Sequence, residues 1–300
     1  MKVDVVVVGA GIQGVGIAQA AAAAGYSVLV IEKTAVAHGT SSKSSKLIHG
    51  GLRYLESFQF SLVRESLQER ALLLKLAPDL VSLKPLHIPI YEHSTRSALT
   101  IRTGLSLYAL LGGLSSDSRF SSIPSNQFSQ LAHLRKESLQ SVFRYFEAQT
   151  DDAALTRAVL ASAQRLGASV EMPAEVVAIE RTSDGVEVTY THDDQSVTVS
   201  CHAVFNCSGP WVEKLIDTSV FPVESPNVEL VQGSHLLLPP VLDTYFYLES
   251  PRDRRAIFVL PWKGRVLLGT TETIYTGDPE QAACTPSERD YLMGTFTYYF

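Results

Sequence analysis

The start of the chain has the hydrophobic pattern of a parallel α/β fold. Lys2–Val8 is a nearly unbroken β-branched run, as expected of a strand that is buried on both faces of a parallel sheet. An alanine-rich stretch then predicts a helix that ends near Gly25, and Ser27–Ile31 predicts the next strand. The first strand leads into Gly9-Ala10-Gly11-Ile12-Gln13-Gly14, which has the spacing GxGxxG.

The glycines of this motif have separate mechanical roles. Gly9 permits a tight turn, Gly11 lets the backbone approach a pyrophosphate, and Gly14 allows the helix to pack closely on the strand. The free N–H groups and the positive dipole of the helix N-terminus also favour phosphate. Glu32 closes the second strand, where it is expected to accept hydrogen bonds from ribose hydroxyls. This order of elements predicts a dinucleotide site; the alternative is a glycine-rich turn that binds nothing.

Beyond the second strand, the chain lacks the regular strand–helix alternation that a nicotinamide dehydrogenase usually shows. Residues 61–76 predict an amphipathic helix with charges on a solvated face and a core-facing stripe of leucines at positions 62, 67, 72, 73 and 76. The apolar run 98–114 predicts a core or interfacial helix, because it is short for a membrane span and contains Arg102.

The second half of the chain reads as further α/β elements followed by strands. The predicted elements are a helix over 152–166, strands at 169–171, 176–181, 186–191 and 203–207, strands at 228–231, 235–238, 256–260 and 266–269, and a helix over 286–300. An Asp184-Gly185 turn links the strands at 176–181 and 186–191 as a hairpin. The chain is therefore expected to pass twice between a nucleotide domain and a β-rich second domain.

Composition narrows the function classes. The 300 residues include 45% hydrophobic and 19% charged residues, as in an ordinary globular protein. The formal net charge of −6 argues against nucleic-acid binding, which needs a dense basic face. The cysteines form no CxxC pair, so neither a zinc site nor a disulfide framework is indicated. The N-terminus has no charged segment before its first strand, and no export signal is expected.

The loop Gly39–Glu56 (GTSSKSSKLIHGGLRYLE) is the most informative segment of the chain. It is rich in hydroxyl groups and contains a glycine pair. From Lys33 through Arg53 there are four cationic side chains and no carboxylate, although the whole chain is acidic. Small hydrogen-bond donors and isolated cations directly after a nucleotide motif predict that a cofactor and an anionic substrate meet at this loop.

These segments together resemble FAD-dependent glycerol-3-phosphate dehydrogenase, of the D-amino-acid-oxidase-like flavoprotein class. The resemblance rests on the GxGxxG motif, SSKLIHGGLRYLE, Leu76-Ala77-Pro78, Asp151-Asp152-Ala153, NCSGPW from Asn206, Gly233-Ser234-His235, VLPW from Val259 and Gly269-Thr270-Thr271. It runs over essentially the whole chain. The sequence departs from the family pattern at Ala154, where arginine is common, and at Glu272, where aspartate is usual.

The resemblance implies an α/β fold in which a Rossmann-like FAD-binding domain of the GR2 or D-amino-acid-oxidase type is interleaved with a β-rich substrate domain. Residues 1–80 and 146–212 are then expected to form the discontinuous FAD-binding domain, and residues 81–145 and 213–300 the substrate domain. The family continues with a segment that completes the flavin pocket and with a cap domain, and we expect both to be absent from these 300 residues.

The resemblance also implies the cofactor, FAD, and the residues that contact it. The cofactor-binding residues are expected to be Gly9, Gly11, Gly14, Glu32, Ser41, Ser42, Ser45, Lys46, Gly50, Val177 and Gly209. No metal is expected.

The resemblance also implies the residues of the substrate site. Arg53 offers a planar fork of donors for a phosphate, and Tyr54 adds a hydroxyl. His235 stands where the family has an active-site histidine, and an imidazole is suited to remove a hydroxyl proton. Thr270 is expected to hydrogen-bond substrate or flavin. For each there is a structural alternative: a surface cation for Arg53, a satisfied core histidine for His235 and an ordinary strand residue for Thr270.

The implied reaction is oxidation of sn-glycerol 3-phosphate to dihydroxyacetone phosphate, with a hydride passing to FAD and the electrons then to a quinone or to oxygen. We expect a cytoplasmic protein, held peripherally at the inner face of the membrane through an apolar surface such as 105–114. The alternatives are a related flavin enzyme acting on an amino or hydroxy acid, and a non-catalytic fragment that binds FAD weakly or acts only as an interaction module.

Overall fold

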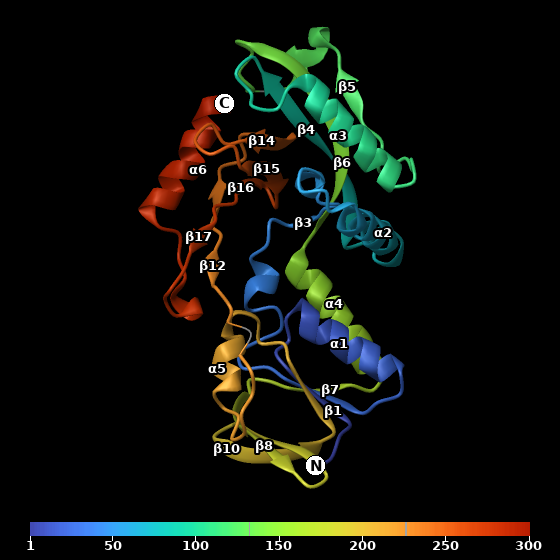
Figure 1. The fold of residues 1–300 in the computed structure, drawn as a ribbon, viewed down its shortest axis with the longest axis vertical. Helices are drawn as coiled ribbons and strands as arrows, with labels where there is room; N and C mark the ends of the chain where they lie inside the picture. The colour runs from blue at the N-terminus through green and yellow to red at the C-terminus, as the bar shows by residue number, and fades with distance from the viewer. Residues whose placement is uncertain (132, 226) are drawn as a thin grey trace. The chain divides into compact units, whose positions relative to one another are not determined.

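The computed structural model describes residues 1–131, 133–225 and 227–300, and within these residues the chain forms two compact units (Figure 1). The first unit comprises Met1–Ser44, Asp151–Leu230 and Thr276–Glu280. The second comprises Ser45–Thr150, Val231–Tyr275 and Gln281–Phe300. These units are defined by packing alone, so the division into FAD-binding and substrate domains at the boundaries given above stays a prediction.

The first unit is built on a parallel sheet with the strand order β11-β1-β2-β7. The strands are β1 (Val5–Val8), β2 (Val28–Ile31), β7 (Ser169–Glu171) and β11 (Ala203–Asn206). All residues of β1 and β2 are buried. This burial explains why their sequences are continuous β-branched and aliphatic runs instead of alternating ones.

Each face of this sheet is covered by a different layer. Val5 and Val7 face a core that includes helices α1 (Ile12–Ala23) and α4 (Asp152–Arg165), which pack against each other (Figure 1). Val6 and Val8 face the opposite core. That core is closed by an antiparallel sheet of β8 (Glu175–Thr182), β9 (Gly185–His192) and β10 (Gln195–Cys201), and by Leu215 of α5 (Val212–Ile216). The predicted hairpin is confirmed as β8–β9.

The second unit is built on a large mixed sheet with the order β13-β16-β15-β14-β4-β6-β3, and β5 pairs with β6 beside it. The strands are β3 (Leu47–Ile48), β4 (Val81–Tyr91), β5 (Ser121–Ile123), β6 (Leu139–Thr150), β13 (His235–Leu238), β14 (Tyr245–Glu249), β15 (Ala256–Trp262) and β16 (Arg265–Gly269). Neighbouring strands are antiparallel except β14 and β4. A separate ladder joins β12 (Val231–Gln232) to β17 (Thr273–Ile274).

Helices cover both faces of this sheet. Helices α2 (Phe60–Leu76) and α3 (Ala98–Leu111) contribute to one core together with residues of β4 and β6. Helix α6 (Pro286–Tyr299) contributes Leu292 and Tyr299 to the other core. Ser97 caps α3 by accepting a hydrogen bond from the Thr100 N–H at 3.1 Å, which explains where this helix begins.

The predicted helix over 61–76 forms, but its predicted faces are partly wrong. The buried side chains of α2 are Val63, Leu67 and Arg70, whereas Leu62 and Leu76 are exposed. Arg70 has no exposed surface, so the charges of this helix are not all on a solvated face. Arg70 is buried because it forms an ion pair with the buried carboxylate of Glu147 on β6, and the sequence of the helix alone does not show this partner.

The predicted strand 228–231 and the predicted apolar surface 105–114 are each only partly right. Of the predicted strand 228–231, only Val231 is in a strand, because the pairing partner Thr273–Ile274 meets the chain at Val231–Gln232. Of the apolar run 105–114, Leu105 and Tyr108 are packed in the core and cannot form a membrane-binding surface. Leu110 and Leu114 of the same run are exposed.

Candidate active site

The glycine motif in the first unit forms a turn that admits no side chains at two of its positions. Gly9 has φ 106°, in the region that favours glycine, and a Cβ there would lie 2.5 Å from the carbonyl oxygen of Cys207. A Cβ on Gly14 would lie 1.9 Å from the carbonyl oxygen of Gly9. Helix α1 therefore begins in direct contact with the turn that follows β1.

The hydroxyl-rich loop returns to the N-terminus of this helix. Gly11 is the N-cap of α1 and has no side chain to satisfy the first N–H groups. Ser41, on the 3₁₀ turn Thr40–Ser42, accepts a hydrogen bond from the Ile12 N–H through its Oγ at 2.9 Å. Ser42 bonds within the loop, where its Oγ donates to the Gly39 carbonyl at 3.1 Å.

Glu32 links the turns that follow β1 and β2. Its Oε2 accepts from the Ala10 N–H at 2.7 Å, and its Oε1 accepts from the Thr34 N–H at 2.8 Å. A carboxylate oxygen has more than one acceptor site, so capacity remains for a hydroxyl of a ligand. The carboxylate thus holds the main chain of the glycine turn.

Two other predicted cofactor residues lie elsewhere in the first unit. Gly209 follows β11, at the same carboxyl edge of the parallel sheet as Gly9 and Glu32, and has φ 58°. Val177 lies at an irregularity in the β8–β9 ladder and is 46% exposed. Ala174, the residue before β8, donates its N–H to the carbonyl of Glu32 at 2.8 Å, which ties the start of β8 to the same edge.

The second unit contains a cavity of about 660 Å³ that gathers several predicted residues. Its lining includes Ser45, Arg53, Tyr54 and Thr270. It also includes residues to which the sequence assigned no site role, among them Arg96, Glu147, Tyr247, Arg254, Arg255 and Glu272.

Arg53 is an exposed cation on the wall of this cavity. Its Nη2 donates to the Tyr54 hydroxyl at 3.4 Å, and its guanidinium lies 5.1 Å from the centre of the Tyr54 ring. Among the described residues, no carboxylate forms an ion pair with Arg53. The Glu272 carboxylate interacts with it electrostatically at longer range. The hydrogen bond with Tyr54 raises the pKa of Arg53 above its ordinary value, so the side chain stays cationic.

Two other cations of the cavity are already paired with carboxylates. Arg96 bonds to Glu56 and Glu249. Arg255 forms an ion pair with Glu272. Each of these guanidinium groups has a carboxylate partner, which distinguishes it from Arg53 as a place for an incoming anion.

His235 and Ser45 are brought together by the sheet. His235 begins β13, opposite Gly269 of β16, and its Nε2 lies 2.9 Å from Oγ of Ser45. Ser45 lines the cavity, so the imidazole is connected to the cavity wall through this hydroxyl. Thr270, the residue after Gly269, lines the same cavity and donates to the Thr271 carbonyl at 3.1 Å.

Glu288 of α6 holds the segments on which His235 and Thr270 lie. This carboxylate is 5% exposed and accepts hydrogen bonds from Thr271 Oγ1 at 2.6 Å and from Ser234 Oγ at 2.9 Å. Burial alone would raise its pKa, but the hydrogen bonds, that from Thr271 foremost, hold the pKa of Glu288 below its ordinary value. Sequence reasoning missed this residue, although Thr285 and Glu288 show the spacing of a capping box.

The remaining predicted residues, Lys46 and Gly50, lie beside β3. Lys46 has φ 61°, and its ammonium is 5.8 Å from the centre of the Trp262 ring. Gly50 is buried, and its N–H donates to side chains of α3 and β6. All the predicted roles in cofactor or substrate contact stay predictions.

A family model described as FAD dependent oxidoreductase matches residues 4–300. The chain belongs to this family. FAD is the family's cofactor, and the fold is the FAD-binding fold of these oxidoreductases.

Individual relatives in the family carry more specific names. The chain is 37% identical to a glycerol-3-phosphate dehydrogenase of Pseudomonas tolaasii, covering 99% of this chain and 58% of that protein. It is 36% identical to a D-erythritol 1-phosphate dehydrogenase of Brucella abortus (strain 2308), over 99% of this chain and 60% of the relative. The chain thus spans less than two thirds of the length of these relatives.

The fold is also found in a solved family structure. The glycerol-3-phosphate dehydrogenase of Bacillus halodurans, determined in complex with FAD, has a TM-score of 0.75 and 26% identity to this chain. The similarity covers 100% of this chain and 53% of the other.

The residues of the first unit fit the nucleotide part of the family's FAD. The turn at Gly9 and Gly14 is closed to side chains, as a main chain that approaches a pyrophosphate must be. Glu32 stands at the carboxyl end of β2 with acceptor capacity for ribose hydroxyls. Over the described ranges, no helix combines the length and apolar character needed to cross a bilayer.

Proposed function

We propose that this chain belongs to an enzyme that oxidises sn-glycerol 3-phosphate to dihydroxyacetone phosphate. The observation that carries the proposal is Arg53, a guanidinium without a carboxylate partner in the described residues, beside the Tyr54 hydroxyl on a cavity wall. A guanidinium fork matches the geometry of a phosphate. The relatives named as dehydrogenases of phosphorylated polyols support the same substrate class.

The residues of the cavity have complementary roles in this proposal. Arg53 and Tyr54 bind the phosphate, and Thr270 orients the substrate hydroxyl. The proton of the secondary alcohol passes to Nε2 of His235, directly or by way of the Ser45 hydroxyl, which lies 2.9 Å away. When bound, FAD supplies the acceptor for the hydride that leaves the alcohol carbon, so that the C–H and O–H bonds break and a carbonyl forms.

The cofactor contacts are proposed as the sequence predicts them. The residues proposed to bind FAD are Gly9, Gly11, Gly14, Glu32, Ser41, Ser42, Ser45, Lys46, Gly50, Val177 and Gly209. The support is the closed glycine turn and the position of Glu32 at the end of β2.

Anaerobic mixing of the FAD-loaded protein with candidate substrates tests the proposed function. Glycerol 3-phosphate is expected to bleach the oxidised flavin absorbance, and unphosphorylated glycerol is not. D-erythritol 1-phosphate belongs in the panel because of the relative of that name. Bleaching only by amino or hydroxy acids would instead assign the enzyme to the related class, and a protein that takes up no FAD would point to a non-catalytic interaction module.

We also propose that the electrons pass to a quinone and that the protein associates peripherally with the cytoplasmic face of a membrane. The exposed Leu110 and Leu114 near the end of α3 support an apolar contact surface, at 62% and 53% exposure. Reduction of a quinone analogue without hydrogen peroxide formation is expected; peroxide as the main product would identify oxygen as the acceptor. Activity found only in the soluble fraction at low and at high salt would contradict membrane association.

A further inference from the structure

The main-chain N–H of Gly50 is held by two buried side chains. It lies 3.1 Å from the hydroxyl oxygen of Tyr108 on α3 and 3.1 Å from Oε2 of Glu147 on β6. Tyr108 has no exposed surface, and Glu147 is 1% exposed. Both acceptors therefore meet this N–H in a part of the protein that excludes water.

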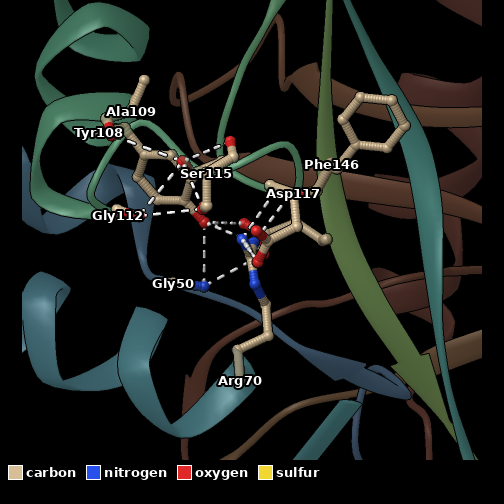
Figure 2. A network of polar contacts seen from close by, with 10 residues as sticks. Gly50, Arg70, Tyr108, Ala109, Gly112, Ser115, Asp117 and Phe146 are labelled. Carbon is tan, nitrogen blue, oxygen red and sulfur yellow. Dashed lines mark hydrogen bonds and ion pairs between the residues drawn. The ribbon is translucent and has the colours of Figure 1, made fainter. Parts of the chain in front are cut away.

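The two acceptors are themselves fixed by a polar network (Figure 2). The Tyr108 hydroxyl donates to Oε1 of Glu147 at 2.7 Å. Arg70 donates through Nη1 to Oε2 of Glu147 at 2.8 Å and to the Phe146 carbonyl at 2.8 Å, and through Nη2 to the Asp117 carbonyl at 2.8 Å. Burial raises the pKa of Tyr108 well above its ordinary value, so its hydroxyl remains a donor to Glu147.

Only glycine allows this approach. A Cβ at position 50 would lie 2.3 Å from the Tyr108 hydroxyl oxygen and 2.5 Å from Cδ2 of Leu67. The next residue, Gly51, has φ 73° and starts the 3₁₀ turn Leu52–Leu55, in which the Tyr54 N–H donates to the Gly51 carbonyl at 2.9 Å. The main chain held at Gly50 thus leads directly into the turn that carries Arg53.

Glu147 also borders the candidate substrate site. Glu147 lines the cavity together with Arg53 and Tyr54. An apolar cluster of similar volume would stabilise the fold about as well as a buried ion pair does, because desolvation offsets much of the Coulombic gain. What the polar network adds is a pair of fixed acceptors for one main-chain N–H.

We propose that Tyr108 and Glu147 are positioning residues, which hold Gly50 so that the Gly51–Tyr54 turn presents Arg53 to the anion. Arg70 bonds to both acceptors and is itself bonded to Asp117, so these two residues fix the acceptors in place. The proposal rests on the proposed function in one respect, namely that Arg53 binds the phosphate of the substrate.

Amide hydrogen exchange on the FAD-loaded protein, measured without substrate, tests whether Tyr108 and Glu147 fix the main chain at Gly50. The variants are Tyr108→Phe and Glu147→Gln, and the matched control is Tyr91→Phe, which removes the hydroxyl bond of another buried tyrosine to the Arg135 carbonyl. Exchange of the amides from Gly50 to Tyr54 is expected to be about tenfold faster in the first two variants, as expected for losing a hydrogen bond with a charged group. Unchanged exchange there, or acceleration equal to that in Tyr91→Phe, would overturn the proposal.

Steady-state kinetics test the consequence for substrate binding. In Tyr108→Phe, KM for glycerol 3-phosphate is expected to rise about tenfold while kcat changes less than about threefold, the signature of lost uniform binding. A fall in kcat with an unchanged KM would contradict a role through Arg53. If the wild-type protein does not oxidise glycerol 3-phosphate, the proposed function fails, and the exchange measurement still decides whether Tyr108 and Glu147 hold this segment.

Discussion

A Cβ atom on Gly269 would lie 2.2 Å from Cδ2 of His235, so the imidazole occupies the volume that a side chain at position 269 would need. The two residues are direct partners across the β13–β16 ladder. The same arrangement sets Nε2 of His235 at 2.9 Å from the Ser45 hydroxyl. A glycine on the neighbouring strand therefore determines where the candidate base can lie.

Replacement of Gly269 by alanine is expected to displace the His235 ring and lower kcat by about 100-fold, since a misplacement of about 1 Å in a catalytic group has effects of this size. Flavin reduction measured in single turnovers would report it. Gly104→Ala on α3 is the matched control, because a Cβ there meets nothing within 4 Å. If Gly269→Ala reduces the flavin as fast as Gly104→Ala does, His235 does not depend on this position.

Loss of the Arg53 guanidinium should weaken substrate binding more than it affects folding. For Arg53→Met we expect KM for glycerol 3-phosphate to rise by about 10- to 100-fold, because a charge-assisted hydrogen bond contributes about 1.5–3 kcal/mol. Arg64→Met, which removes an exposed cation from α2, is the control and should leave KM unchanged. Similar KM values in the two variants would assign phosphate binding to another cation, of which Arg254 is the first to examine.

Two glycines of helix α1, Gly14 and Gly16, differ in the space available for a side chain and so make a matched pair of substitutions. Gly14→Ala would bring a Cβ to 1.9 Å from the Gly9 carbonyl oxygen, whereas a Cβ on Gly16 meets nothing within 4 Å. We expect Gly14→Ala to lose most of its FAD, and Gly16→Ala to retain it and to gain about 0.5–1 kcal/mol of stability from helix propensity. Fluorescence of released FAD and thermal unfolding measure these effects. Full FAD retention by Gly14→Ala would mean that the nucleotide does not depend on this turn.

The carboxylate of Glu288 should make the second unit sensitive to acid. Its pKa in the folded state is below the ordinary value of 4.5, so its stabilising contribution is complete above pH 4.5 and is lost as the pH falls through the folded-state pKa. Removing the charge in Glu288→Gln is expected to lower the free energy of unfolding at neutral pH by about 1–3 kcal/mol.

Urea unfolding measured between neutral and acidic pH tests this expectation. The difference in stability between wild type and Glu288→Gln should shrink as the pH falls below 4.5. Glu65→Gln, at an exposed site on α2, is the control and should follow the wild-type curve. A constant difference at every pH would mean that the charge of Glu288 contributes nothing.

The sequence predicted the first unit well because its signals are local. The run Val5–Val8, the glycine motif and the helix after it are contiguous, and each is readable from its own residues. Long-range strands were harder to predict. Strand β4 contains Pro85 and Pro89, and it is stabilised by its ladder with β6, which pairs residues far away along the chain.

For the candidate site, the family resemblance predicted Arg53, Tyr54 and Thr270. The structure gathers these residues around one cavity, and their roles stay predictions. The residues that hold them in position were not predicted. Arg70, at a buried position of α2, has its carboxylate partner on β6, and only the three-dimensional pairing shows that this charge belongs to the interior.

The bonds from Ala10 and Thr34 to Glu32 have a consequence for the kinetics of cofactor uptake. Because the carboxylate ties the two turns together within the protein, the loss of conformational entropy that orders them occurs during folding and not during association. The association rate of a nucleotide at this edge should then rise in proportion to its concentration, without the plateau that a slow ordering step would impose.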